Sequence, residues 1–272
     1  MIGTIKAELR KSRRPAVFVS AGLLAAVTVL FYLANWYVAK HPGATPRESV
    51  SLLTLYPDQL VSNIIGASFP IGAAIAIVLG AIFAGSEYGW GTLKTILTQH
   101  PGRLTVWAGR VIVFAFLTAL LTVVLFAFAA AMSVLVASVE GHAITWPAFT
   151  DFAKGFGAIW LILTVNGTIG IALGTLIRQP AAALGIGLTY ILAVEIIAVR
   201  FIHLINGGAY DWVTNNFVNQ NATALAQSFH SAALAPAPAP VVSAAHAVAV
   251  LLAYGVALLI VSAGLVRMRD VT

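Results

Sequence analysis

The sequence predicts an all-α integral membrane protein with six transmembrane helices and both termini in the cytoplasm. Three observations lead to this prediction: the composition, six long apolar runs, and the positions of the basic residues. Of the 272 residues, 60% are hydrophobic and only 9% are charged. A soluble domain carries about 25% charged residues, because its surface must be hydrated. Lipid must therefore be the solvent for most of this chain.

Six apolar runs are long enough to cross a bilayer, since a helix rises about 1.5 Å per residue and the hydrocarbon core is about 30 Å thick. Backbone groups in lipid must be satisfied internally, and the runs lack turn signals, which favours helices over barrel strands. The first run is longer than the apolar part of a signal peptide, so we expect it to be retained. The predicted spans are 15–37, 60–84, 108–137, 154–177, 181–202 and 244–266.

The basic residues give the predicted orientation. If the N-terminus is inside, eleven of the fifteen Lys and Arg residues fall in inner segments and four in outer ones. Cytoplasmic loops carry an excess of Lys and Arg, so this bias predicts two cytoplasmic termini. The segment 203–243 is then external, and within it Asn221 is expected to cap a helix that continues to about Leu234.

Residues 1–14 form a second kind of element. Ile2, Ile5 and Leu9 recur at i, i+3 and i+7, with basic residues elsewhere on the helical wheel. This pattern predicts an amphipathic helix lying on the inner leaflet, with membrane lipids as its partner, and a disordered basic tail is the alternative. The net charge of +6 is typical of such a flank, so no nucleic-acid partner is expected.

The loop 87–103 contains a short predicted helix. Thr92 can cap it, and Pro101 followed by Gly102 ends it. Leu93, Ile96 and Leu97 fall at i, i+3 and i+4, on one apolar face. A two-turn helix is too short to persist alone in water, because isolated helices need about 12–15 residues. The apolar face must therefore dock on the membrane or in a groove of another protein.

The sequence of this loop, EYGWGTLKTILTQHPGR, follows the second span of a six-helix chain with a basic amphipathic N-terminus. In these features the chain resembles the ABC-2-type ABC transporter permeases. The resemblance implies that the loop is a coupling helix that docks on a separate ATP-binding subunit. It also implies a second permease copy or paralogue as partner, and a bacterial cell membrane as location.

Residue roles follow from the resemblance by position. It implies that Glu87, just below the bilayer, ties the loop to a basic group, Arg10 or Lys11. The residues that it assigns to partner docking are Gly91, Thr92, Leu93, Lys94, Ile96, Leu97, Pro101 and Arg103.

No catalytic machinery is predicted for this chain. The phosphate-binding pattern G-x-x-x-x-G-K-[ST] is absent from the sequence, so ATP and magnesium are expected to bind to the partner subunit. Cysteine is also absent, and the six histidines are never spaced at i, i+4. The sequence therefore predicts neither a cofactor nor a metal site.

Polar residues inside the predicted spans have two interpretations. Glu195 is the one acidic residue within a span, and it serves either a structural role, such as pairing with Arg200, or transport. The others either form interhelical hydrogen bonds or line a pathway. The candidate lining residues are Asn63, Ser68, Thr164, Asn166 and Glu195.

Three functions are compatible with these features. The first is the permease subunit of an ATP-driven exporter of an apolar or amphipathic substrate, such as a drug, peptide or lipid. The second is a secondary transporter or facilitator that works without ATP, although ion-coupled carriers usually place several carboxylates in the membrane and this chain offers one. The third is a passive structural subunit, which would leave the docking helix unexplained.

Overall fold

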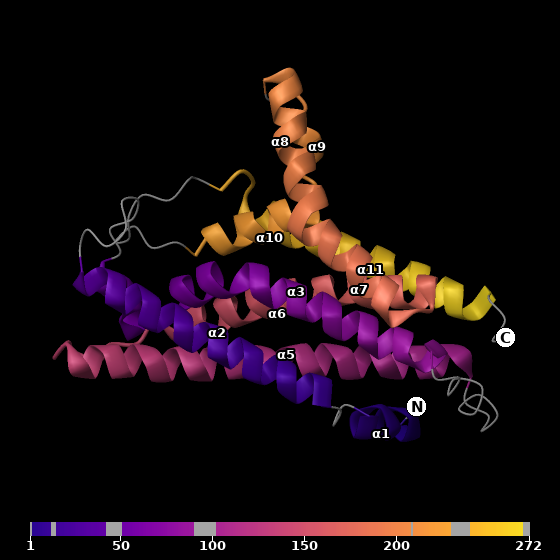
Figure 1. The fold of residues 1–272 in the computed structure, drawn as a ribbon, viewed down its shortest axis with the longest axis horizontal. Coiled ribbons are helices and arrows are strands. Elements are labelled where there is room, and N and C mark those ends of the chain that lie inside the picture. The colour runs from indigo at the N-terminus through magenta and orange to yellow at the C-terminus, as the bar shows by residue number, and fades with distance from the viewer. Residues whose placement is uncertain are drawn as a thin grey trace.

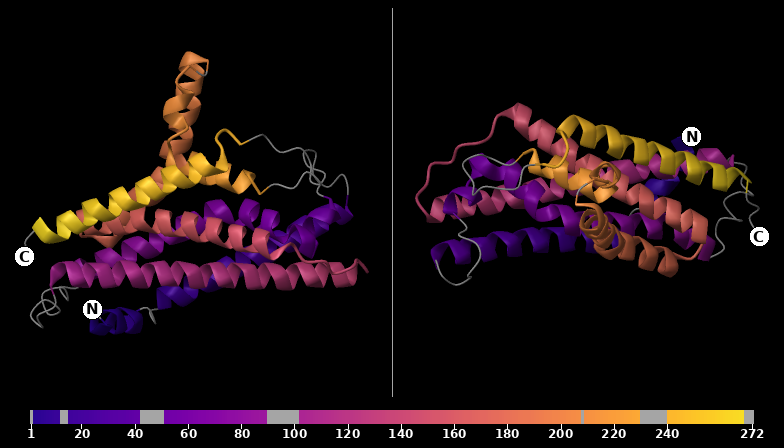
Figure 2. Two further views of the ribbon diagram at one scale, coloured as in Figure 1. Left: turned by 180° about the vertical axis from the view of Figure 1, so that it is seen from behind. Right: turned by 90° about the horizontal axis from the view of Figure 1, so that it is seen from above.

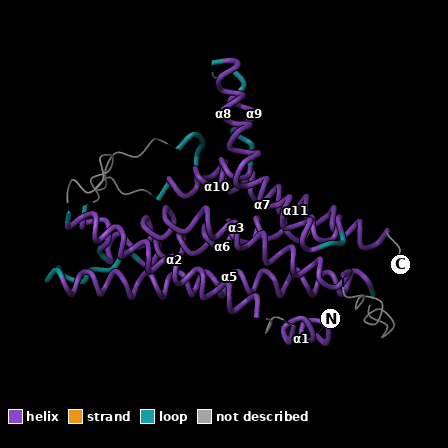
Figure 3. The backbone as a smooth tube through the Cα atoms, viewed as in Figure 1, coloured by secondary structure: helices purple, strands orange, loops and turns teal. Residues whose placement is uncertain are grey.

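The computed structural model describes residues 2–11, 15–41, 51–89, 102–207, 209–229 and 240–268. The described residues are helical almost throughout, and none of them lies in a strand (Figure 3). This confirms the predicted all-α class, which lipid imposes because every backbone polar group in it must find a partner within its own segment.

Five helical runs are long and apolar enough to cross a membrane, and a sixth counts if a bent helix is taken as one span. The bent one is α3 (Leu60–Gly89) together with the 3-10 turn before it, where the segments Pro57–Ile65 and Pro70–Ser86 meet at 56°. Pro70 explains the bend, since proline removes a backbone hydrogen bond and its ring clashes with the preceding turn. The five runs are α2 (Pro15–Lys40), α5 (Arg103–Val139), α6 (Phe149–Ile177), Pro180–Ile205 and α11 (Ala244–Met268).

The helices extend beyond the predicted spans. Helix α5 begins five residues before the predicted residue 108, and α3 continues past residue 84 to Gly89. The hydropathy pattern ends where the apolar run ends, whereas a helix persists until the backbone changes conformation. For α5 this happens at the extended Gly102.

The run Pro180–Ile205 is not one regular helix. It comprises α7 (Pro180–Thr189), a π-helical turn η3 (Tyr190–Val194) and α8 (Glu195–Asn206). With the short α9 (Asp211–Thr214), α8 stands away from the bundle (Figure 1). A π turn is one of the few features that bend a helix sharply. Large apolar side chains of α8 are consequently exposed, Leu204 to 80%.

Helices α3 and α6 form the centre of the bundle and approach closely through glycines. A Cβ added at Gly80 would lie 2.1 Å from the carbonyl oxygen of Gly167, and one added at Gly170 would lie 2.2 Å from that of Ile77. The two backbones are therefore in direct contact, which only residues without side chains allow. A Cβ added at Gly174 would lie 2.9 Å from the carbonyl oxygen of Ala81 and 3.0 Å from the nitrogen of Gly85, both in α3.

Tryptophan and threonine side chains connect the other spans. The Thr118 and Thr164 hydroxyls lie 2.8 Å apart between α5 and α6. The indole N–H of Trp160 donates to the Ala115 carbonyl at 2.9 Å, and that of Trp107 donates to Ser262 of α11 at 3.2 Å. These bonds hold α5 against α6 and α11.

Both ends of the chain lie at the same end of the bundle (Figures 1 and 2). The last residue of α3, Gly89, and the first of α5, Arg103, lie there as well (Figure 1). So does the tight turn between α6 and α7, where Arg178 ends α6 with a left-handed φ of 60°. Pro180 of this turn packs on Gly85 of α3. We call this end of the bundle the terminal end.

A polar cluster closes the opposite end. Glu140, after α5, accepts a 2.8 Å hydrogen bond from the indole of Trp36 and forms a 2.6 Å ion pair with Lys40 of α2. Hydrogen bonding to Lys40, then to Trp36, lowers the pKa of Glu140, so this carboxylate stays ionised at neutral pH. The ring of Tyr56 stacks on His142 with centroids 3.8 Å apart, beside the short helices η1 (Leu52–Leu55) and η2 (Pro57–Gln59).

The described part of segment 203–243 contains a helix of the expected kind, but with other bounds. Helix α10 (Val218–Gln227) packs against α11 and α3. The prediction that Asn221 caps it was wrong, because Asn221 lies inside the first turn. Its amide instead donates to the carbonyls of Asn215 and Phe217, at 2.8 Å each. Leu225 is buried, and Phe229 packs against the core just after the helix.

Candidate functional site

The predicted docking segment falls largely outside the described residues. This applies to Gly91, Thr92, Leu93, Lys94, Ile96, Leu97 and Pro101. Its last member, Arg103, begins α5, where the carbonyl of Gly102 accepts the backbone N–H groups of Thr105 and Val106 at 2.9 and 3.1 Å. The structure thus places the two attachment points of the segment, Gly89 and Gly102, at the terminal end.

The N-terminal segment is a helix, α1 (Ile2–Lys11), as the amphipathic pattern predicts. It packs against the start of α5, where a Cβ on Gly109 would lie 3.1 Å from the methyl group of Thr4. Glu8 is only 2% exposed, whereas Leu9 is 37% exposed. The face of α1 that packs on the bundle therefore includes Thr4, Ile5 and Glu8, and Leu9 lies outside this contact.

Glu8 is buried against the bundle, which the sequence reasoning did not anticipate. The available signal was its position four residues after Thr4, which puts both on one helix face. An acidic residue on the buried face of a basic helix is unusual, because burying a charge costs several kcal/mol unless it is paired. Arg110 of α5, the helix against which α1 packs, is also buried, at 3% exposure.

The predicted anchor of the loop is only partly described. Glu87 lies in the last turn of α3, but its side chain and that of Lys11 are outside the described residues. Arg10 is exposed on α1. The tie between Glu87 and a basic residue of α1 therefore stays a prediction.

Two of the candidate lining residues form hydrogen bonds inside the bundle. Thr164 pairs with Thr118, and the amide of Asn166, 1% exposed, donates to the Ile162 carbonyl of its own helix at 2.9 Å. Such bonds satisfy the polar groups without a substrate. Whether these residues also line a pathway stays a prediction.

Two lining candidates, Asn63 and Ser68, lie in α3. Asn63 is half-buried, and its Nδ2 has no hydrogen bond of normal geometry within the described chain. The hydroxyl of Tyr32 from α2 lies near this amide. Ser68 is in the same helix, but its side chain is not among those described.

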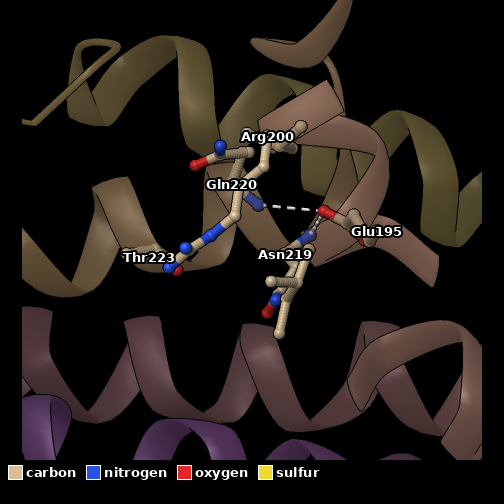
Figure 4. Close-up of a pocket in the computed structure, with 7 residues that line it drawn as sticks. Glu195, Arg200, Asn219, Gln220 and Thr223 are labelled. Atoms are coloured by element: carbon tan, nitrogen blue, oxygen red, sulfur yellow. Dashed lines mark hydrogen bonds between the residues drawn. The ribbon is translucent and has the colours of Figure 1, made fainter. Parts of the chain in front are cut away.

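Glu195 occupies a defined site. It is 2% exposed and is the first residue after the π turn. Its Oε1 accepts the backbone N–H groups of Asn219 and of Gln220, the latter at 3.1 Å (Figure 4). The carboxylate of the fifth span thus binds the N-terminus of α10.

An open pocket of about 240 Å³ adjoins this contact. The side chains of Arg200, Gln220 and Thr223 gather to one side of Glu195 (Figure 4). Glu195 and Arg200 form no ion pair in the described chain, so pairing with Arg200 is not the structural role that Glu195 has here. The residues that line the pocket are Glu195, Ile196, Val199, Arg200, Asn219, Gln220 and Thr223.

Comparison with known proteins identifies the family. A model described as ABC-2 family transporter protein matches residues 4–194, more than two thirds of the chain. None of the curated proteins compared with the chain matches it. The matched stretch runs from α1 to the π turn and includes the predicted docking segment. Together with the multi-pass helical architecture, this match shows that the chain belongs to the ABC-2 family of transporter proteins.

Proposed function

We propose that this chain is the membrane-spanning permease subunit of an ATP-driven ABC exporter, energised by a separate ATP-binding subunit that docks on the segment 91–103. The observation that carries the proposal is the family match over residues 4–194, which includes this segment. Association with an ATP-binding subunit is a general property of the family. The coupling role of Leu93, Ile96 and Leu97 is the specific part of the proposal.

The arrangement of the terminal end supports this docking site. Helix α1, the end of α3, the start of α5 and the turn after α6 all lie there (Figure 1). A subunit bound between α3 and α5 would contact several membrane helices at once, and its movement would act on the closely packed α3–α6 pair. Described basic residues at this end include Lys6, Arg10, Arg103, Arg178 and Arg267, which favours a cytoplasmic location.

Opposite labelling of two cysteines is expected to establish this orientation. The chain has no cysteine of its own, so Gln179→Cys and Val241→Cys each create a single target. Both positions are exposed, Gln179 at the terminal end and Val241 just before α11. In intact cells a membrane-impermeant maleimide should label the cysteine at 241, and the one at 179 only after permeabilisation. Equal labelling of both in intact cells would contradict the proposed topology.

The substrate is proposed to be apolar or amphipathic. Several buried hydroxyl groups of the bundle bind carbonyls of their own helices, including those of Thr28, Thr122, Thr168 and Thr175. Few polar groups are thus left to replace the hydration of a strongly polar substrate. One such chain would pair with a second copy or a paralogue to form the complete pathway.

Co-purification tests the proposal against its alternative, a facilitator that works without ATP. A permease solubilised from its native membrane in mild detergent should retain an ATP-binding subunit, and the complex should hydrolyse ATP. Mass spectrometry identifies the bound protein, and a phosphate-release assay measures the hydrolysis. A chain that purifies alone, but transports in vesicles without ATP, would instead be a facilitator.

A further inference from the structure

The N-terminal N–H groups of α10 donate their hydrogen bonds to a side chain of another helix. The first N–H groups of a helix have no partner within it, and a side chain of the N-cap residue usually accepts them. Here the N-cap is Phe217, which makes no capping bond. The acceptor is Oε1 of Glu195, which lies 24 residues before Asn219.

The chemistry of this contact is favourable. A carboxylate near a helix N-terminus interacts with the positive end of the helix dipole, and hydrogen bonds to an ionised acceptor are about twice as strong as neutral ones. The contact is also shielded from water, because Glu195 is only 2% exposed. The second oxygen, Oε2, is buried without a hydrogen bond of normal geometry in the described chain, although the Tyr190 side chain lies close to it.

The π turn sets the direction of this side chain. An extra residue in one turn rotates the side chains that follow by about 100° relative to an uninterrupted α-helix. Glu195 directly follows that turn. The bend that carries α8 out of the bundle therefore also sets the orientation from which the carboxylate meets α10.

The rest of α10 is held by apolar contacts. Val218, Ala222 and Leu225 are each at most 3% exposed, in the core shared with α3, α6 and α11. Apolar burial fixes the helix on the bundle but has little directionality. The two backbone hydrogen bonds to Glu195 fix its first turn against the fifth span.

We propose that Glu195 is a positioning residue for transport: it anchors the first turn of α10 to the fifth span, and the outer segment opens when this anchor is released. The link between this release and transport rests on the proposed function. The anchor itself does not, because it follows from the contacts of one chain. The adjoining pocket gives the released turn space next to its closed position.

Hydrogen–deuterium exchange of the chain in nanodiscs tests the anchor. Glu195→Met fills a similar volume but cannot accept the two N–H groups, whereas Glu195→Gln keeps one acceptor oxygen without the charge. We expect exchange within 217–227 to become about ten- to a hundredfold faster in the Met variant and less so in the Gln variant. Exchange within 247–262 of α11 should not change.

Thr175→Val is the matched control, since the Thr175 hydroxyl is buried but binds only the Ile171 carbonyl of its own helix. It should leave exchange of α10 unchanged. Unaltered exchange in the Met variant would overturn the anchor. Faster exchange throughout α3, α6 and α10 would also overturn it, because the effect would then be general destabilisation.

The transport role needs a second measurement, on the complex with the co-purified ATP-binding subunit. Adding Mg-ATP should speed exchange within 217–227 in the unmodified complex. The Met variant, already released, should show no further increase. If ATP leaves α10 equally protected in the unmodified complex, the transport role is overturned while the anchor stands. If no ATP-binding subunit is found, the proposed function fails and the anchor is still tested by the single chain.

Discussion

Replacing Leu93 and Leu97 together with aspartate is expected to release the ATP-binding subunit and leave the membrane helices intact. Burying Leu93, Ile96 and Leu97 contributes on the order of 4–9 kcal/mol before ordering costs. Two carboxylates in the same cleft would instead have to be desolvated without partners, which costs several kcal/mol each. Because each 1.4 kcal/mol changes affinity tenfold, we expect a loss of at least about a hundredfold.

The measurement is the amount of ATP-binding subunit that stays with the permease during size-exclusion chromatography. Thr95→Asp combined with Thr98→Asp adds the same two charges on the opposite face of the predicted helix and should retain the partner. Both double variants should insert normally, since neither changes a predicted span. Full partner binding and ATP-driven transport in the Leu93/Leu97 variant would place the docking face on other residues.

The parts of the fold that were predicted correctly depend on local sequence patterns. A run of about 20 apolar residues defines a span wherever it occurs, because the length of the run and the thickness of the bilayer decide the outcome. The turn between α6 and α7 also has a local cause, because Pro180 cannot continue α6 and is well suited to begin α7. The count of six depends on α3, because the bend at Pro70 divides this helix and it counts as a span only when both parts are taken together.

The parts that were missed depend on contacts between distant segments. The capping of α10 by Glu195 joins residues 24 positions apart, and no local pattern identifies a cap that comes from another helix. The sequence rule for caps selected Asn221, a residue of the right type whose amide serves a different purpose. The packing of α1 on α5 has a similar cause. It involves the small Gly109 on α5, which the apolar pattern of α1 does not contain.

The glycine contacts between α3 and α6 could be predicted only in part. The spacing of Gly167, Gly170 and Gly174 indicated close packing of the fourth span, because small residues at intervals of three and four share one helix face. The identity of the partner, α3, required the structure. The contact is backbone against backbone, so it leaves almost no freedom for a side chain at either surface.

Gly170→Ala is therefore expected to destabilise the bundle strongly for a change of one methyl group. The new Cβ would lie 2.2 Å from the Ile77 carbonyl oxygen and 2.8 Å from the Ala81 nitrogen, and neither backbone atom can move away without shifting α3. Overpacking of this kind costs about 1–3 kcal/mol, which lowers Tm by about 2–4 °C per kcal/mol in a chain of this size.

The matched control is Gly185→Ala in α7, where a Cβ meets nothing within 4 Å. Alanine there should leave stability unchanged or raise it by about 0.5–1 kcal/mol, because glycine loses more conformational freedom when a helix forms. Thermal unfolding of both variants in the same detergent, followed by tryptophan fluorescence, gives the comparison. The close approach of α3 and α6 requires a lower Tm in the Gly170 variant than in the Gly185 variant, and equal values would mean that the two helices are further apart.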